Sequence, residues 1–117
     1  MAKHLDTGIY GESMASEYLI KRGYVIKARN YRFGRAEIDI IAEKDNILSF
    51  VEVKTRSDNS FGYPETFVSE RKADKIREGA ESYLEQNNWP GHIRFDIIAV
   101  EIIADRTPLI SHFMDAF

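Results

Sequence analysis

The chain has 117 residues, of which 44% are hydrophobic and 30% are charged, a balance that excludes a disordered protein and favours one globular domain spanning residues 1–117. It contains no cysteine, which excludes disulfides and thiolate metal sites. No apolar run approaches the length of a membrane span and the N-terminus has no apolar signal core, so we expect a cytoplasmic protein without a membrane partner.

The first predicted element is a helix that begins at a cap, Asp6 or Thr7, and runs to about residue 22, where Gly23 ends it. Apolar residues at helical spacing predict the buried stripe of this helix. The stripe consists of Ile9, Met14, Ala15, Tyr18 and Leu19. Glu12 lies near the edge of the stripe, so its carboxylate is expected beside the core.

A strand is expected at residues 24–29, followed by a loop around Gly34, and this part of the chain is basic although the net charge is −3. Residues 21–35 contain six Lys or Arg side chains and no acid, with Tyr and Phe residues between them. Such a stretch favours contact with nucleic-acid phosphates and stacking on unpaired bases. The alternative is a solvated basic strand whose aromatic residues pack inward. The arginines proposed to contact DNA are Arg29, Arg32 and Arg35.

Two further strands, residues 37–41 and 50–54, carry charges among β-branched and aromatic residues. A polar turn at residues 44–46 predicts that they pair as a hairpin. Because side chains on a strand alternate between its faces, Glu37 and Asp39 are expected to share one face of the first strand.

By the same rule, Glu52, Lys54 and Arg56 share one face of the second strand. If the strands pair, carboxylates and a lysine converge on one surface, which is what a metal-dependent phosphodiesterase requires. Arg56 would hold a phosphate there, or pair with a local acid. The alternative for the whole cluster is an ion-paired sheet surface without a metal.

After a polar loop at residues 57–63, Ser69 is expected to cap a second helix that ends at about residue 87. The first turns of this helix are basic through Arg71, Lys72 and Lys75. A solvated helix face is the favoured interpretation of these residues. The alternative is contact with a DNA backbone, for which Lys72 is the candidate.

A strand at residues 93–103, a turn at 105–108 and a short strand at 109–113 complete the chain. The predicted order is therefore α-β-β-β-α-β with a small C-terminal extension. Asp96 lies between apolar residues, where a buried ion pair with an arginine is favoured over a functional acid. The three histidines show no ligand spacing, so a zinc site is not expected.

This order, with an acid on the second strand and Glu-x-Lys on the third, resembles the restriction-endonuclease-like nucleases. The closer resemblance is to the small bacterial YraN-like family, related to the archaeal Holliday-junction resolvases. The motifs that carry it are Gly-Glu at 11–12, Asn-Tyr-Arg at 30–32, Glu-Ile-Asp-Ile-Ile-Ala at 37–42, Phe-Val-Glu-Val-Lys-Thr-Arg at 50–56 and Arg-Phe-Asp-Ile-Ile-Ala-Val at 94–100. The resemblance implies a restriction-endonuclease-like α/β core with a central mixed sheet flanked by helices.

The resemblance also implies a Mg²⁺ site, with Mn²⁺ as a substitute. Its implied ligands are Asp39, Glu52 and the backbone carbonyl of Val53. Lys54 would orient the attacking water and offset charge on the phosphate. Glu12 matches a helix-borne acid that completes the site. Glu37 has no counterpart in the simplest motif, and it would support the site or bind a second ion.

Two functions are compatible with these residues. The leading hypothesis is a Mg²⁺-dependent DNA endonuclease acting on branched or flapped DNA such as Holliday junctions, where a homodimer would suit two equivalent strands. The alternative is a nuclease fold that binds branched or single-stranded nucleic acid, or a protein partner, without turnover. The acidic net charge favours this alternative, because a resolvase should bind its substrate strongly through phosphates.

Overall fold

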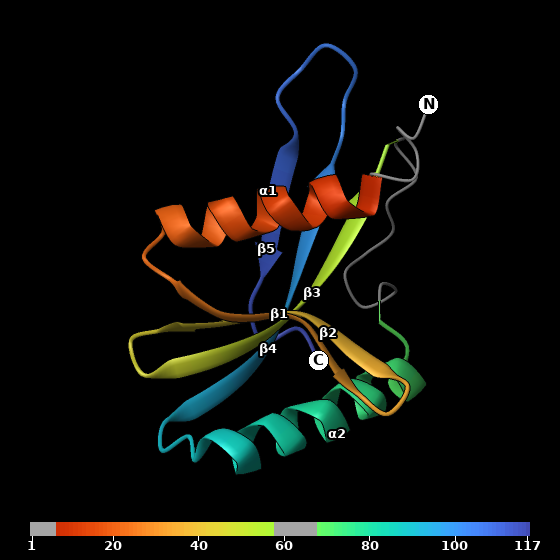
Figure 1. Cartoon of the computed structure of the whole chain (residues 1–117). Helices are drawn as coiled ribbons and strands as arrows, with labels where there is room; N and C mark the ends of the chain where they lie inside the picture. Colours follow the sequence, from red (N-terminus) through yellow and green to blue (C-terminus); the bar gives the residue numbers. More distant parts are fainter. Residues whose placement is uncertain (1–6, 58–67) are drawn as a thin grey trace.

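The structure, a computed structural model, describes residues 7–57 and 68–117 (Figure 1). Its elements in chain order are α1 (Thr7–Lys21), β1 (Val25–Phe33), β2 (Ala36–Lys44), β3 (Ile47–Arg56), α2 (Glu70–Asn87), β4 (His92–Glu101) and β5 (Leu109–Phe113). This is the predicted order, including the short strand predicted at residues 109–113, and it confirms an α/β fold consistent with a restriction-endonuclease-like core. Asp6 and residues 58–63 of the predicted loop lie outside the described residues.

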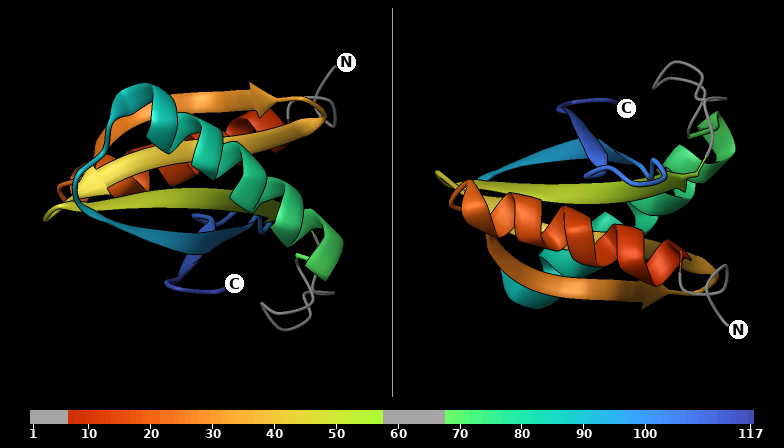
Figure 2. Two further views of the ribbon diagram at one scale, coloured as in Figure 1. Left: turned by 90° about the horizontal axis from the view of Figure 1, so that it is seen from below. Right: turned by 90° about the horizontal axis from the view of Figure 1, so that it is seen from above.

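The five strands form one mixed sheet in the order β1-β2-β3-β4-β5. β1, β2 and β3 pair antiparallel through two short turns, β4 pairs in parallel with β3, and β5 pairs antiparallel with β4. A parallel pair needs a connection that crosses the sheet, and α2 supplies it. α1 covers one face of the sheet and α2 covers the opposite face (Figures 1 and 2).

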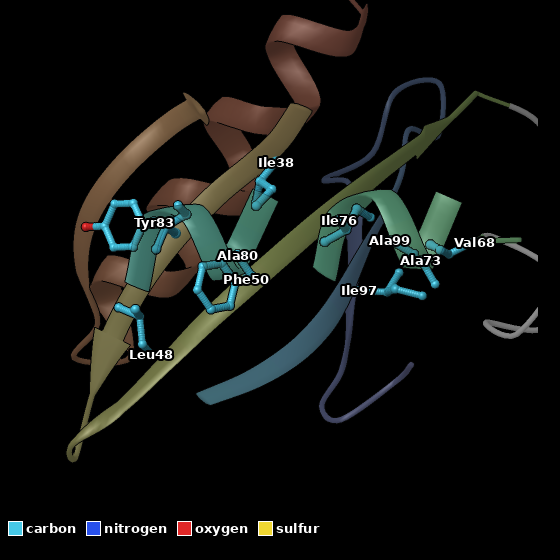
Figure 3. Close-up of a cluster of buried hydrophobic side chains, with 11 residues drawn as sticks. Ile38, Leu48, Phe50, Val68, Ala73, Ile76, Ala80, Tyr83, Ile97 and Ala99 are labelled. Carbon is cyan, nitrogen blue, oxygen red and sulfur yellow. The ribbon is translucent and has the colours of Figure 1, made fainter. Parts of the chain in front are cut away.

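A hydrophobic cluster fills each interface between helix and sheet. The α2-side cluster, drawn in Figure 3, consists of Ile38, Ile41, Leu48, Phe50, Val68, Ala73, Ile76, Ala80, Tyr83, Ile97 and Ala99. The α1-side cluster consists of Ala15, Leu19, Tyr24, Ile40, Ala42, Val51, Ile98 and Val100. Ala15 and Leu19 are buried as predicted, but the prediction for Ile9 is wrong, because this residue is 68% exposed. The space beside Ile9 is an open cavity instead of packed side chains.

Gly11 lets α1 approach β3 closely. A Cβ atom at this position would overlap Oγ1 of Thr55 and would lie 2.9 Å from its Cβ. Only glycine fits without movement of one element, since real Cβ atoms do not approach so closely. Glu12, the next residue of α1, lines a cavity together with residues of β1 and β2.

The ends of α2 follow the sequence signals. The Ser69 hydroxyl accepts a hydrogen bond from the backbone N–H of Lys72 at 3.2 Å, which confirms the predicted cap. The helix ends at Asn88, which takes the left-handed conformation with φ of 48°. Among the helices of the described residues, none is long and apolar enough to cross a lipid bilayer.

Asp96 on β4 is fully buried and connects the C-terminal residues to the sheet. Its carboxylate accepts two hydrogen bonds from Arg94, each 2.9 Å long, and one from the backbone N–H of Asp115 at 3.1 Å. His112 of β5 places Nε2 2.8 Å from the same carboxylate, and Arg94 also donates to the Tyr24 hydroxyl at 2.9 Å. The favoured interpretation, a buried ion pair with an arginine, is confirmed.

Candidate active site

Strands β2 and β3 separate beside Asp39. The pairing of β2 with β3 ends at Ile40 and Val51. Two residues farther along β3, the backbone N–H of Val53 donates a hydrogen bond to Oδ2 of Asp39 at 2.8 Å. The Asp39 side chain therefore takes the place of a backbone acceptor, and this bond holds its carboxylate against β3 where the strands part.

Side-chain alternation along β2 breaks at Asp39. Ile38 packs in the α2-side cluster and Ile40 in the α1-side cluster, although residues two apart on a regular strand share a face. On β1, Asn30 lies opposite Asp39 in the register and takes a φ of 51°, so both strands are irregular at this level. β1 also continues to Phe33 through Asn30 instead of ending at residue 29 as predicted.

Glu37 and Asp39, the two acids that were expected to share a face, line different cavities. Asp39 lines a cavity on the α1 side, whereas Glu37 lines a cavity on the α2 side. Glu12 of α1 is nevertheless repelled by both carboxylates, so one common face for Glu37 and Asp39 stays a prediction. Glu37 lies 3.7 Å from Arg32 of β1.

Glu52 meets Asp39 from β3 and is almost completely buried, with 3% of its side chain exposed. Its Oε2 atom lies 2.7 Å from Nζ of Lys72, the third residue of α2. Its Oε1 atom is buried and has no hydrogen-bond partner among the described residues. One oxygen of the Glu52 carboxylate is thus paired with a lysine, and the other has no partner among the described residues.

The close packing of these groups shifts their pKa values. Burial, followed by the proximity of Glu52, raises the pKa of Asp39 to about 7. Burial, followed by repulsion from Lys72, lowers the pKa of Lys54. Burial also acts to lower the pKa of Lys72, but the Glu52 carboxylate outweighs it, so this pKa is raised overall. Two carboxyl groups and two amino groups therefore share one half-buried site.

Glu12 approaches this site from α1. Burial raises the pKa of Glu12, and repulsion from Asp39 and Glu37 raises it further. Glu12 and Asp39 both line the α1-side cavity, which has a volume of about 300 Å³. Ser16 also lines this cavity and has a buried Oγ atom without a partner among the described residues. The helix-borne acid is thus placed beside Asp39, as the resemblance implied.

The five predicted DNA-binding cations are all exposed. Arg29 lines the α1-side cavity, and Arg35 and Lys72 line the α2-side cavity. Arg32 is 76% exposed on β1, and Arg56 is the last residue of β3. Their contact with DNA stays a prediction. The contact of Lys72 with Glu52 was not predicted, and the only signal for it in the sequence is that Ser69 fixes Lys72 in the first turn of α2.

Within residues 7–57 and 68–117, no three Asp, Glu or His side chains converge as a metal-binding group. The side-chain donors brought together between β2 and β3 are the carboxylates of Asp39 and Glu52. A cation at this point would need further oxygen ligands from the backbone or from water, which suits Mg²⁺ better than an ion that demands a complete protein cage. The predicted ligand roles of Asp39, Glu52, Val53 and Glu37 stay predictions.

Comparisons with known proteins identify relatives along the whole chain. The model of the uncharacterised protein family UPF0102 matches residues 11–100. A UPF0102 protein of Flavobacterium psychrophilum is 48% identical over 100% of this chain and 98% of its own length. A UPF0102 protein of Cytophaga hutchinsonii is 44% identical over 97% of this chain and 96% of its own length, and one of Clostridium perfringens is 42% identical over 94% and 92%. The segment matched by the family model extends from Gly11 within α1 to Val100 of β4 and so includes the site.

Proposed function

The chain belongs to the uncharacterised protein family UPF0102, and we propose that it is a metal-dependent endonuclease that hydrolyses phosphodiester bonds in DNA. The observation that carries the proposal is the meeting of Asp39 and Glu52 where β2 and β3 separate, with Lys54 and Lys72 beside them. The proposed substrate is branched or flapped DNA such as a Holliday junction, after the resemblance to the archaeal resolvases. A homodimer would present two such sites to the two equivalent strands of a junction.

The arrangement of these groups does not serve stability. Two neighbouring carboxyl groups repel each other when both are ionised, and the raised pKa of Asp39 expresses this cost together with burial. The unpartnered Oε1 of Glu52 adds the penalty of a buried acceptor, about 1–3 kcal/mol. Groups perturbed in this way, gathered beside a cavity, are typical of functional sites.

The donor set fits a divalent cation. Mg²⁺ prefers oxygen ligands and is commonly bound by one or two carboxylates while it keeps several waters. Asp39 and Glu52 would hold Mg²⁺, or Mn²⁺ in its place, and the open Oε1 of Glu52 supports this assignment. The Val53 carbonyl and Glu37 are the proposed further ligands. When bound, the ion supplies a Lewis acid for the phosphate and lowers the pKa of a coordinated water.

The remaining side chains have separate proposed roles. The half-buried amino group of Lys54 orients the attacking water and offsets the charge that develops on the phosphate. Its lowered pKa also brings proton exchange closer to neutral pH. Glu12 completes the acidic group from the α1 side. Arg56 holds the backbone of the bound strand.

A cleavage assay with matched variants tests the proposal. We expect the wild type, with Mg²⁺ or Mn²⁺, to cut end-labelled four-way junction or flap DNA, and Glu52→Gln to be inactive because it removes a ligand charge. Glu43→Gln is the control, since Glu43 is a carboxylate of the neighbouring strand β2 that lies 3.7 Å from Lys27, toward the end of β2 away from the site. Equal cleavage by wild type and Glu52→Gln would contradict the proposal.

The ion pair of Lys72 with Glu52 favours a second candidate function. Because Nζ of Lys72 lies 2.7 Å from Oε2 of Glu52, a cation of the protein already neutralises this carboxylate. A module that binds nucleic acid without hydrolysing it would need only this neutralisation of the carboxylate by a lysine. Electron paramagnetic resonance would show whether the wild type binds Mn²⁺. A wild type that binds both Mn²⁺ and DNA but does not cleave the DNA would favour this second function.

A further inference from the structure

The α2-side cavity contains a concentration of positive charge next to the candidate active site. This cavity, called here the basic cavity, has a volume of about 300 Å³ and lies between the β1–β2 turn and the first turns of α2. Its charged lining residues are the cations Arg35, Arg71, Lys72 and Lys75 and the acid Glu37. Among the described residues of its wall, cations thus outnumber acids by four to one.

Three of these cations have no counter-charge among the described residues. Arg35, Arg71 and Lys75 have no ion-pair partner within residues 7–57 and 68–117. Arg77, on the same helix but outside this cavity, instead pairs with Asp74 at 3.1 Å. Like charges gathered around one cavity repel one another and attract anions. Among the cations of α2, the two without an ion-pair partner in the described residues, Arg71 and Lys75, therefore both line the basic cavity.

We propose that the basic cavity binds a phosphate group of the nucleic-acid strand that enters the candidate active site. The proposal rests on the proposed function for the identity of that strand. Lys72 lines the basic cavity and also contacts Glu52, so the cavity and the site share a wall. A phosphate next to the bond to be cut would therefore be held while the bond itself lies beside Asp39 and Glu52.

The chemistry of the lining suits a tetrahedral anion. Guanidinium groups bind phosphate oxygens through two parallel hydrogen bonds, and lysines add point charges. Arg35 reaches the cavity from the β1–β2 turn, whereas Arg71 and Lys75 come from one face of α2, so the cations surround the anion from two elements. An internal backbone phosphate and a terminal 5′-phosphate share this chemistry.

DNA binding without metal tests the proposal independently of cleavage. The full chain in EDTA is titrated with a fluorescent oligodeoxythymidine, and binding is followed by anisotropy at several salt concentrations. We expect Arg71→Ala and Lys75→Ala each to weaken binding about fivefold to tenfold and to reduce the slope of log K against log[salt] by about 0.7, the effect of one lost phosphate contact on a single strand. Arg77→Ala should leave affinity and slope unchanged, and Lys75→Arg should keep both.

Oligonucleotides with and without a 5′-phosphate distinguish the two sources of the anion. A terminal site predicts that the phosphate strengthens binding to the wild type and not to Arg71→Ala, whereas a backbone site predicts equal losses for both oligonucleotides. Arg71→Ala and Lys75→Ala variants that bind with the affinity and salt slope of Arg77→Ala would overturn the proposal. Failure of the nuclease proposal would leave this binding measurement unaffected, because no arm requires metal or turnover.

Discussion

The packing of Gly11 against Thr55 predicts that one added methyl group separates α1 from β3. An alanine Cβ at position 11 would overlap Oγ1 of Thr55 and lie 2.9 Å from its Cβ and 3.0 Å from its Cγ2. Overpacking of this kind costs about 1–3 kcal/mol, and three close contacts on a β-branched side chain place the cost near the upper limit. The gain in helix propensity from Gly to Ala is about 1 kcal/mol. We therefore expect Gly11→Ala to lose about 2 kcal/mol of unfolding free energy.

Gly8 of the same helix supplies the matched control, because a Cβ there has no atom within 4 Å. Gly8→Ala should be neutral or gain up to about 1 kcal/mol. In thermal unfolding followed by circular dichroism, Gly11→Ala should melt about 8 °C below the wild type, at about 4 °C per kcal/mol for a domain of this size. The double variant Gly11→Ala, Thr55→Ala should recover more than half of this loss. A Gly11→Ala protein as stable as Gly8→Ala would refute the reasoning.

Three further predictions concern metal, pH and DNA. Mg²⁺ at ten times its dissociation constant should stabilise the wild type by about 1.4 kcal/mol in a thermal shift assay, and an equal shift in Asp39→Asn would argue against a ligand role for Asp39. Burial acts to raise the pKa of Asp96, but its contacts with His112, Arg94 and the Asp115 N–H hold that pKa below its ordinary value. The stabilisation of the folded state by ionised Asp96 is therefore present above about pH 4 and is lost as the pH falls further. Asp96→Asn should therefore cost about 3 kcal/mol at pH 7, and its urea unfolding should depend less on pH below pH 4 than that of the wild type; parallel profiles would contradict this. Arg32→Ala should weaken DNA binding and lower its salt slope by about 0.7–0.9, and an unchanged slope would remove Arg32 from the DNA-contacting residues.

The parts of the fold that depend on local signals could be predicted from the sequence. The Ser69 cap, the turn at residues 44–46 and the left-handed Asn88 each follow from a side chain or a backbone preference within a few residues. The proximity of Asp39 and Glu52 was predictable for the same reason, because a short hairpin turn fixes which residues of its two strands lie together.

The parts that depend on packing between distant elements could not be predicted. The contact of Lys72 with Glu52 is set by the way α2 crosses the sheet, which no periodicity in the helix encodes. The break of alternation at Asp39 arises where β2 and β3 separate, and strand propensity does not report separation. His112 contacts Asp96 through the pairing of β5 with β4, so its lack of metal-ligand spacing along the chain did not indicate its role.

The mixed sheet has a consequence for the order in which the site is assembled. β1, β2 and β3 are neighbours in sequence joined by short turns, so their pairing requires only small loops to close, whereas β4 can pair with β3 only after the chain has formed the long connection that contains α2. We therefore expect the β1–β3 meander to form early in folding and to bring Asp39 and Glu52 together before α2 docks. The two carboxylates that repel each other, Asp39 and Glu52, would then come together in the part of the chain that folds first. The ion pair of Lys72 with Glu52 would form later, when α2 docks on the sheet.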